Sequence, residues 1–118
     1  MNWDSKERRK FVRIKCPCEI VIPGPKKHIL PTYIENISAG GIRFIIEEKI
    51  KLSSTVELNL YGIDQNPIIC KGRVRWVFTK KDPCIQSRFL YDTGIEFSQI
   101  KKEDLDAIKN LVVEISSS

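Results

Sequence analysis

Three arginines stand close together near the start of the chain, at Arg8, Arg9 and Arg13. A guanidinium is a fixed planar cation whose donors match phosphate oxygens or the O6/N7 edge of guanine in pairs, and its face can stack on a base. Three such groups within six positions therefore indicate a site for a compact, multiply charged nucleotide. Charge alone is equally compatible with a solvated basic tail.

A second polar cluster, NISAGG at residues 36–41, has the composition of a tight turn. The side chains of Asn36 and Ser38 can bond the backbone of such a turn, and Gly40 and Gly41 can adopt positive φ or let a ligand approach the main chain closely. A plain β-turn has the same composition. Taken alone, this cluster does not distinguish a binding site from a turn.

The other reactive residue types form no catalytic or metal-binding pattern. The single histidine, His28, lies in a Lys-rich loop without a nucleophile motif, and no pair of carboxylates has a recognisable acid/base or metal spacing. Cys16, Cys18 and Cys70 occur on the apolar faces of predicted strands, whereas zinc sites favour paired cysteines in Gly-rich loops. We therefore expect no enzyme, no metal ion, and thiols that act as small core residues.

These side chains need a scaffold, and the period of the chain predicts one made mostly of strands. Apolar and polar residues alternate over six segments, as half-buried strands require. In the fifth segment, Trp76 and Phe78 are expected on the core face and Val77 on the outer face. The sixth contains a turn signal, DTG at 92–94, that can split it. The predicted strands cover residues 13–22, 29–37, 41–48, 55–62, 67–78 and 87–97.

The end of the chain changes to a helical period. Leu105, Ile108 and Leu111 fall on one face, which predicts an amphipathic helix over about 101–115, with Ser98 as its N-cap. The 118 residues are enough for one hydrophobic core. No apolar run reaches the length of a membrane-spanning helix, and we expect a cytoplasmic protein without membrane insertion.

The distribution of charge along the chain indicates where an anion would bind. The chain has a formal charge of +5, and residues 1–15 supply six basic side chains against two acidic ones. The excess of positive charge therefore lies mostly at one end, which indicates a local anion site rather than a generally basic surface.

Together, the two polar clusters resemble the bipartite signature of the PilZ domain family, receptors for the bacterial second messenger cyclic di-GMP. The signature is Arg9-x-x-x-Arg13, followed after 22 intervening residues by Asn36-x-Ser38-x-x-Gly41. The segments GRVRWV and TGIEF, ahead of the amphipathic helix, also resemble that family in order and spacing, so the likeness runs from about residue 7 to 115. Asn36 stands where the family more often has Asp.

The resemblance implies a mainly β fold: a six-stranded antiparallel, Greek-key, split-barrel-like β-barrel with a C-terminal α-helix. It implies a single domain over residues 1–115, with a basic N-terminal arm at 1–13 and the helix at about 101–115. Cyclic di-GMP would lie between the arm and the turn at 36–41, on the outer surface of the barrel.

The resemblance also implies a role for each residue of the signature. Arg9 and Arg13 would contact guanine edges and phosphates, Asn36 and Ser38 a guanine edge or the phosphodiester, and Gly41 would permit the turn and a close approach. Arg8 resembles the doubled arginine of members that take up a stacked pair of ligands. Further candidates for the site are Gly40, Arg43, Arg73 and Arg75.

We therefore expect a cyclic di-GMP receptor whose N-terminal arm changes conformation on binding and which signals to a downstream protein in trans. One alternative keeps the PilZ fold as a protein-interaction module without a ligand. Another is a small β-barrel that binds single-stranded nucleic acid, which requires aromatic and basic residues interleaved on an outer strand face. Nucleic acid is disfavoured because the aromatic residues are expected to point inward.

Overall fold

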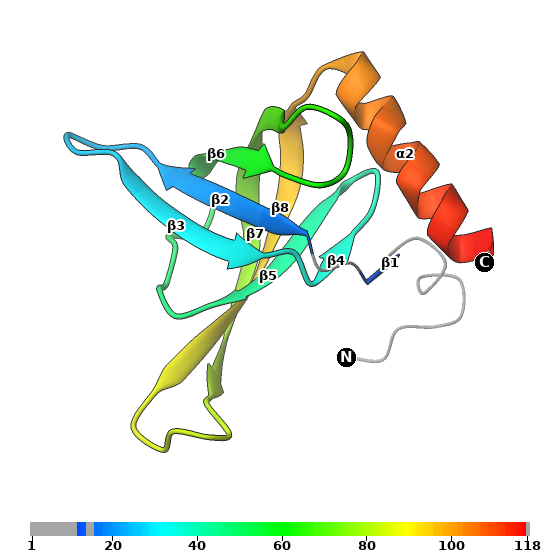
Figure 1. Cartoon of the computed structure of the whole chain (residues 1–118). Helices are drawn as coiled ribbons and strands as arrows, with labels where there is room; N and C mark the ends of the chain where they lie inside the picture. The colour runs from blue at the N-terminus through cyan, green and yellow to red at the C-terminus, as the bar shows by residue number, and fades with distance from the viewer. Residues whose placement is uncertain (1–11, 14–15, 118) are drawn as a thin grey trace.

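The computed structural model describes residues 12–13 and 16–117 of the chain. This part consists of one antiparallel sheet of eight strands and a C-terminal helix (Figure 1). The elements are β1 (Val12–Arg13), β2 (Pro17–Ile22), β3 (His28–Tyr33), β4 (Asn36–Ile37), β5 (Gly41–Ile46), β6 (Thr55–Leu60), β7 (Ile68–Lys81), β8 (Phe89–Gln99) and α2 (Lys102–Ser117). The predicted mainly β, antiparallel fold with a terminal helix is confirmed.

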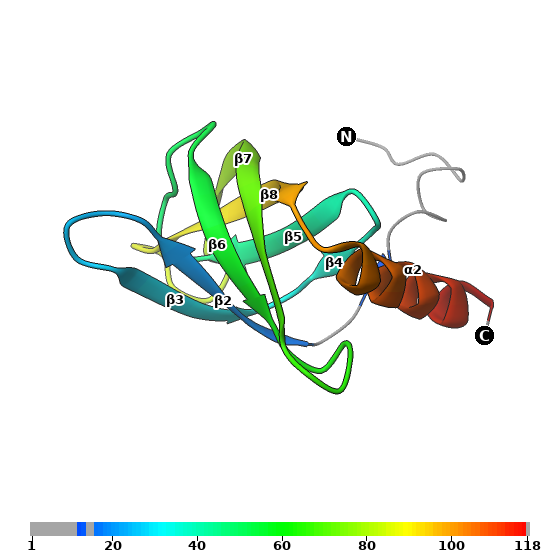
Figure 2. The ribbon, with the colours of Figure 1, turned by 90° about the horizontal axis from the view of Figure 1, so that it is seen from above.

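The strand order is β1-β4-β5-β8-β7-β6-β2-β3, so that β1 and β3 form the two edges. Six strands are at least six residues long, and two short ones, β1 and β4, extend the sheet next to β5. The sheet curls strongly (Figures 1 and 2), but within the described residues no strand pairing joins its two edges. It is therefore a half-barrel with eight strands, two more than expected.

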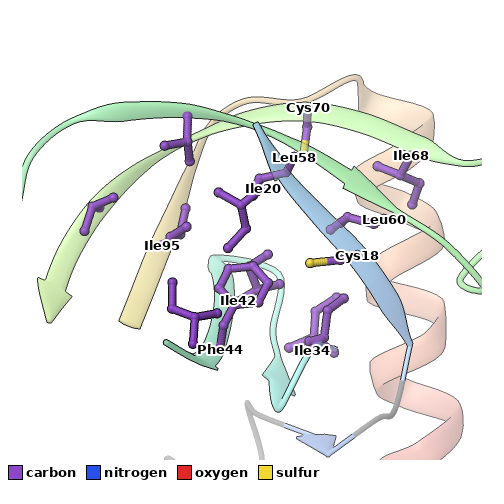
Figure 3. Close-up of a cluster of buried hydrophobic side chains, with 14 of the residues drawn as sticks. Cys18, Ile20, Ile34, Ile42, Phe44, Leu58, Leu60, Ile68, Cys70 and Ile95 are labelled. Carbon is purple, nitrogen blue, oxygen red and sulfur yellow. The ribbon is translucent and has the colours of Figure 1, made fainter. Parts of the chain in front are cut away.

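The concave face of the sheet holds the hydrophobic core. Ile20, Phe44, Leu58 and Val74, each from a different strand, are fully buried in one cluster. Figure 3 shows the side chains of Ile20, Phe44 and Leu58 converging with that of Ile95. Burial of apolar surface is the main favourable term in folding, so these alternating positions fix which face of each strand turns inward.

Two local signals that often interrupt strands occur within the predicted strands: Pro17, which cannot donate to a ladder, and the turn signal at 92–94. Pro17 is the first residue of β2, where its missing N–H does not interrupt a ladder. The turn signal at Asp92-Thr93-Gly94 does not split the last strand, because β8 runs without a break from Phe89 to Gln99. Asp92 and Thr93 are buried within this strand, where their side chains are bonded to neighbouring groups.

A β-bulge in β7 makes the predicted orientation of its second half wrong. Val74 pairs with Ile95 and Trp76 pairs with Gly94, so Arg75 is an extra residue without a partner in β8. One extra residue shifts the alternation by one, since side chains point to opposite faces with period two. Val77 consequently packs against the core, and Phe78 is 57% exposed.

Helix α2 closes the core at one side of the sheet. Ile108 is fully buried, and the helix lies beside β1 and β4 (Figures 1 and 2). Ser98 is not its N-cap, because β8 continues through Gln99 and the first intrahelical bond runs from the N–H of Leu105 to the carbonyl of Lys101. In the described part of the chain, no helix is long and apolar enough to cross a membrane.

Candidate functional site

A pocket of about 300 Å³ opens on the outer face of the sheet, over strands β4, β5, β8 and β7. Its size is at the lower end of the range for small-molecule sites. The residues that line it combine backbone glycines with polar side chains and one aromatic ring. They are Asn36, Ser38, Gly40, Gly41, Ile42, Arg43, Arg75, Trp76, Gly94, Ile95 and Glu96.

The turn between β4 and β5 forms one wall of the pocket. The N–H of Ser38 donates to the carbonyl of Gly41 at 2.9 Å, and the Ser38 hydroxyl oxygen accepts from the N–H of Gly40 at 3.1 Å. The carbonyl of Gly40 accepts from the N–H of Phe97 at 3.0 Å, which ties the turn to β8. The Ser38 side chain is thus held by the turn itself while it faces the pocket.

Gly41 is required by space rather than by its backbone angles. A Cβ at this position would overlap the carbonyl oxygen of Ile95 on the neighbouring strand. Among the described residues, positive φ occurs only at Ser53 and Gly62, so neither Gly40 nor Gly41 uses the conformational freedom that their sequence suggests. The glycine allows β5 and β8 to lie close together under the pocket.

Trp76 and Gly94 form the opposite side. They are paired across β7 and β8, and a Cβ on Gly94 would overlap the indole ring of Trp76. The ring also stacks on Phe78 at a centroid distance of 5.3 Å. Because the bulge turns Trp76 outward, the indole lines the pocket instead of the core, contrary to the prediction.

A network of charged groups stands beside the pocket. The Arg43 guanidinium donates from Nε to Oδ1 of Asp92 and from Nη2 to Oδ2, both at 2.7 Å. Nζ of Lys80 lies 2.9 Å from Oδ2 of the same carboxylate. In the amide orientation that satisfies both neighbours, Oδ1 of Asn36 accepts from Nη1 of Arg43 at 3.0 Å, and Nδ2 donates to the carbonyl of Glu35 at 2.8 Å.

The ionisation of Asp92 follows from this network. Burial by itself would raise the pKa of the carboxyl, but the hydrogen bonds and charges of Arg43 and Lys80 outweigh burial and hold the pKa below the ordinary value of 3.8. The same carboxylate raises the pKa of Arg43. The pair is therefore ionised at neutral pH.

The remaining candidate arginines take different positions. Arg75 lines the pocket with Nε 3.5 Å from Oε2 of Glu96, and both side chains are about half exposed. Arg73 is exposed and is not among the lining residues. The backbone of Arg13 lies in β1 and pairs with that of Asn36, while Arg8 and Arg9 lie outside the described residues.

Sequence reasoning missed three features of the site: the outward ring of Trp76, the buried carboxylate of Asp92 and the open floor at Gly94. Only Gly94 carries a local signal, since a glycine inside a strand often marks a close approach. The bulge that turns Trp76 outward is a property of the pairing between β7 and β8, which local alternation does not encode.

The thiols form no metal site in the part of the chain that the structure describes, where no three metal-ligating side chains are grouped. Cys16, Cys18, Cys70 and Cys84 are free. Burial raises the pKa of Cys18, and it raises that of Cys70 to about 12, so neither thiol is a thiolate at neutral pH. Cys18 and Cys70 are core residues, as their positions in the sequence predict.

Solved structures of similar fold include Bacillus subtilis MotI/DgrA, an inhibitor of motility, with a TM-score of 0.70 at 19% identity over 89% of this chain and 48% of the other. The K. pneumonia MrkH–c-di-GMP complex has a TM-score of 0.66 at 14% identity, over 88% of this chain and 49% of the other. This chain thus spans about half the length of both. The PilZ domain of Escherichia coli YcgR with c-di-GMP has a TM-score of 0.65 at 11% identity, over 93% of this chain and 92% of the other.

Among curated proteins, none matches this chain. The model of the PilZ domain family matches residues 7–114, which include both polar clusters, every strand of the sheet and most of α2. The chain therefore belongs to the PilZ domain family.

Proposed function

We propose that this chain is a non-catalytic receptor for cyclic di-GMP. The observation that carries the proposal is the backbone pairing of Arg13 with Asn36, which brings the second arginine of the signature beside the polar wall of the pocket. Cyclic di-GMP has two phosphates and two guanines, the groups for which clustered guanidinium side chains are suited. The YcgR domain and MrkH, which share the fold, were each solved with this ligand.

In this proposal, Arg8, Arg9 and Arg13 supply the positive charge, and Asn36 and Ser38 supply directed polar groups in the wall of the pocket. Gly40 and Gly41 keep the wall free of side chains, which lets a guanine or phosphate approach the backbone. The indole of Trp76 adds an apolar surface on which a base can lie.

Output is proposed to follow from the arm at residues 1–13. Ligand binding would change the conformation of the arm, and the changed surface would be recognised by a downstream protein. A cytoplasmic location is part of the same proposal, because the ligand is an intracellular messenger.

Isothermal titration of the full chain with cyclic di-GMP tests the receptor proposal. We expect binding by the wild type and a loss of affinity of about tenfold or more in Arg9→Ala and in Arg13→Ala, because each variant removes charge-assisted hydrogen bonds. Arg73→Ala is the matched control, since it removes the same charge from an exposed position outside the pocket. No heat with the wild type, or equal affinity in all variants, would overturn the proposal.

Single-stranded nucleic acid is the second candidate ligand, and one observation favours it. Trp76 and Phe78 stack on the outer face, next to Arg75 and Lys80, whereas the sequence placed both rings inside. A mobility-shift assay with oligonucleotides distinguishes the two ligands. We expect only weak binding that disappears at moderate salt, as for general phosphate contacts; tight, salt-resistant binding would favour nucleic acid.

A further inference from the structure

Arg43 was a candidate for direct contact with the ligand, but its guanidinium is already occupied. Each of the three nitrogens has a partner within the protein: Nε and Nη2 bond to Asp92, and Nη1 bonds to the amide oxygen of Asn36. The planar fork of an arginine fits a carboxylate in this two-bond arrangement. Only 24% of the Arg43 side chain is exposed, so it is held in place rather than free to follow a ligand.

Asp92 is the anchor of this arrangement. Its side chain is 7% exposed and lies on β8, between Arg43 on β5 and Lys80 on β7. A buried carboxylate that binds cations from both neighbouring strands is rigidly placed. Arg43 pairs with Gly94 and Lys80 with Leu90, each two positions from Asp92 along β8, so the register of the three strands sets the position of the Arg43 fork.

The amide of Asn36 needs such a fixed neighbour. An amide is asymmetric: its oxygen only accepts and its nitrogen only donates, and the two ends exchange places when the group turns over. With Arg43 bound to the oxygen and the Glu35 carbonyl bound to the nitrogen, one orientation is selected. One lone pair of the oxygen and one N–H then remain for a ligand in the pocket.

We propose that Arg43, held by Asp92, is a positioning residue that fixes the orientation of the Asn36 amide and thereby selects a guanine edge in the pocket. This inference rests on the proposed function. Arg43 then acts on the ligand indirectly, through Asn36. The buried ion pair between Arg43 and Asp92 contributes to ligand recognition as well as to the stability of the sheet.

A double-mutant cycle tests the inference. The dissociation constant for cyclic di-GMP is measured for the wild type, Asp92→Asn, Asn36→Ala and the double variant. Asp92→Asn should weaken binding by about tenfold in the wild type, as expected for the loss of one well-placed hydrogen bond, and by less than about twofold in the Asn36→Ala background. Equal losses in both backgrounds, or no loss in either, would overturn the inference.

Lys80→Met is the matched control. It removes the other cation that binds Asp92 and leaves both bonds between Arg43 and Asp92, so affinity should stay within about twofold of the wild type. If Asp92→Asn fails to fold, Arg43→Lys replaces it in the cycle with the same expected outcomes, since a lysine keeps the charge but has no fork. A Lys80→Met loss equal to that of Asp92→Asn would contradict the role of Arg43.

Nuclear magnetic resonance separates this inference from the receptor proposal. In the ligand-free protein, the side-chain NH2 signals of Asn36 should be one well-resolved pair in the wild type and should shift or broaden in Asp92→Asn. A wild type that shows the ordered amide but binds no cyclic di-GMP would overturn the proposed function and the selection of a guanine edge, but not the positioning of the Asn36 amide by Arg43. An Asn36 signal that is indifferent to Asp92→Asn would overturn the positioning role.

Discussion

At the scale of single residues, the site depends on glycines that make room. Gly41 lets the Ile95 carbonyl approach, and Gly94 lets the Trp76 ring lie against the strand. Neither requirement is a matter of turn conformation, because neither residue has positive φ. The charged residues are also fixed in place, because the buried carboxylate of Asp92 binds both Arg43 and Lys80.

The contact between Gly94 and Trp76 makes a first prediction. Gly94→Ala should lower the free energy of unfolding by about 1–3 kcal/mol, because the new methyl group overlaps the indole and forces it to move. Denaturant unfolding measures this loss. Gly40→Ala is the control: its Cβ would meet only ordinary contacts, and we expect a change within about 0.5 kcal/mol. Equal effects of the two substitutions would contradict the packing described for Trp76.

The depressed pKa of Asp92 makes a second prediction, on stability against pH. A carboxyl whose pKa is lower in the folded protein stabilises it above its unfolded pKa, near 3.8, and this contribution is lost as the pH falls through the folded pKa. Asp92→Asn should cost about 3 kcal/mol near neutral pH, because it breaks a buried ion pair. The difference between wild type and variant should shrink below pH 3.8.

Denaturant unfolding across this pH range checks the second prediction. Asp106→Asn serves as control, since Asp106 is exposed on α2 and its loss should change stability little at any pH. A difference between wild type and Asp92→Asn that stays constant into acid would show that the ion pair is not what the substitution removes.

At the scale of elements, the bulge in β7 decides which side chains form the pocket. Before Arg75, the buried residues follow the alternation of the sequence; after it, the phase is reversed. The reversal puts Trp76 in the pocket and leaves Phe78 exposed on the outer face; beyond these residues the β7–β8 hairpin extends away from the rest of the sheet (Figure 1). A local irregularity in one strand thus creates the aromatic side of the site.

The reversed phase can be measured with neighbouring substitutions. Val77→Asp should lower the free energy of unfolding by about 2 kcal/mol or more, because it brings a charge against the core. Phe78→Asp should cost less than about 1 kcal/mol, the loss of its stacking on Trp76. Thermal or denaturant unfolding of the two variants is the measurement. A larger loss of stability in Phe78→Asp than in Val77→Asp would show that side chains alternate through β7 without the reversal at Arg75.

At the scale of the whole molecule, one continuous core holds the half-barrel and the helix together. It is built by residues from six strands and from α2, while the pocket lies on the outer face of the same sheet. Two of the four free cysteines, Cys18 and Cys70, are part of this core, and Cys84 is exposed near the end of the β7–β8 hairpin. The reactivity of Cys18 and Cys70 therefore reports on opening of the core, and that of Cys84 on the exposed hairpin.

Labelling of the native protein with a thiol-specific disulfide reagent makes a fourth prediction. Cys84 should react first and the half-buried Cys16 more slowly, whereas Cys18 and Cys70 should react only through opening of the core, because burial and raised pKa values suppress their thiolates. Cys84→Ser should remove the fast phase. Rapid labelling of Cys18 or Cys70 without denaturant would contradict the burial of these two thiols in the core.

Much of the fold could be predicted from the sequence because its signals are local. The six long strands, the terminal helix and the inward cysteines follow from alternation and period, and the turn at 36–41 follows from its residue types. The continuity of β8 could not be predicted, since Asp92 is stabilised by Arg43 and Lys80 on neighbouring strands and not by its own segment.

Residue types and their spacing identify the chemical groups of the candidate site, the clustered arginines and the Asn-Ser-Gly-Gly turn, and the family to which the chain belongs. That Trp76 faces the pocket and that Arg43 is bound to Asp92 is seen only once the strands are paired. Both features depend on pairing between strands: the orientation of Trp76 on the pairing of β7 with β8, and the Arg43–Asp92 contact on the pairing of β5 with β8, across 49 positions of the chain. One unpaired residue at Arg75 reverses a strand face, and the partners of a buried charge are set by strand register.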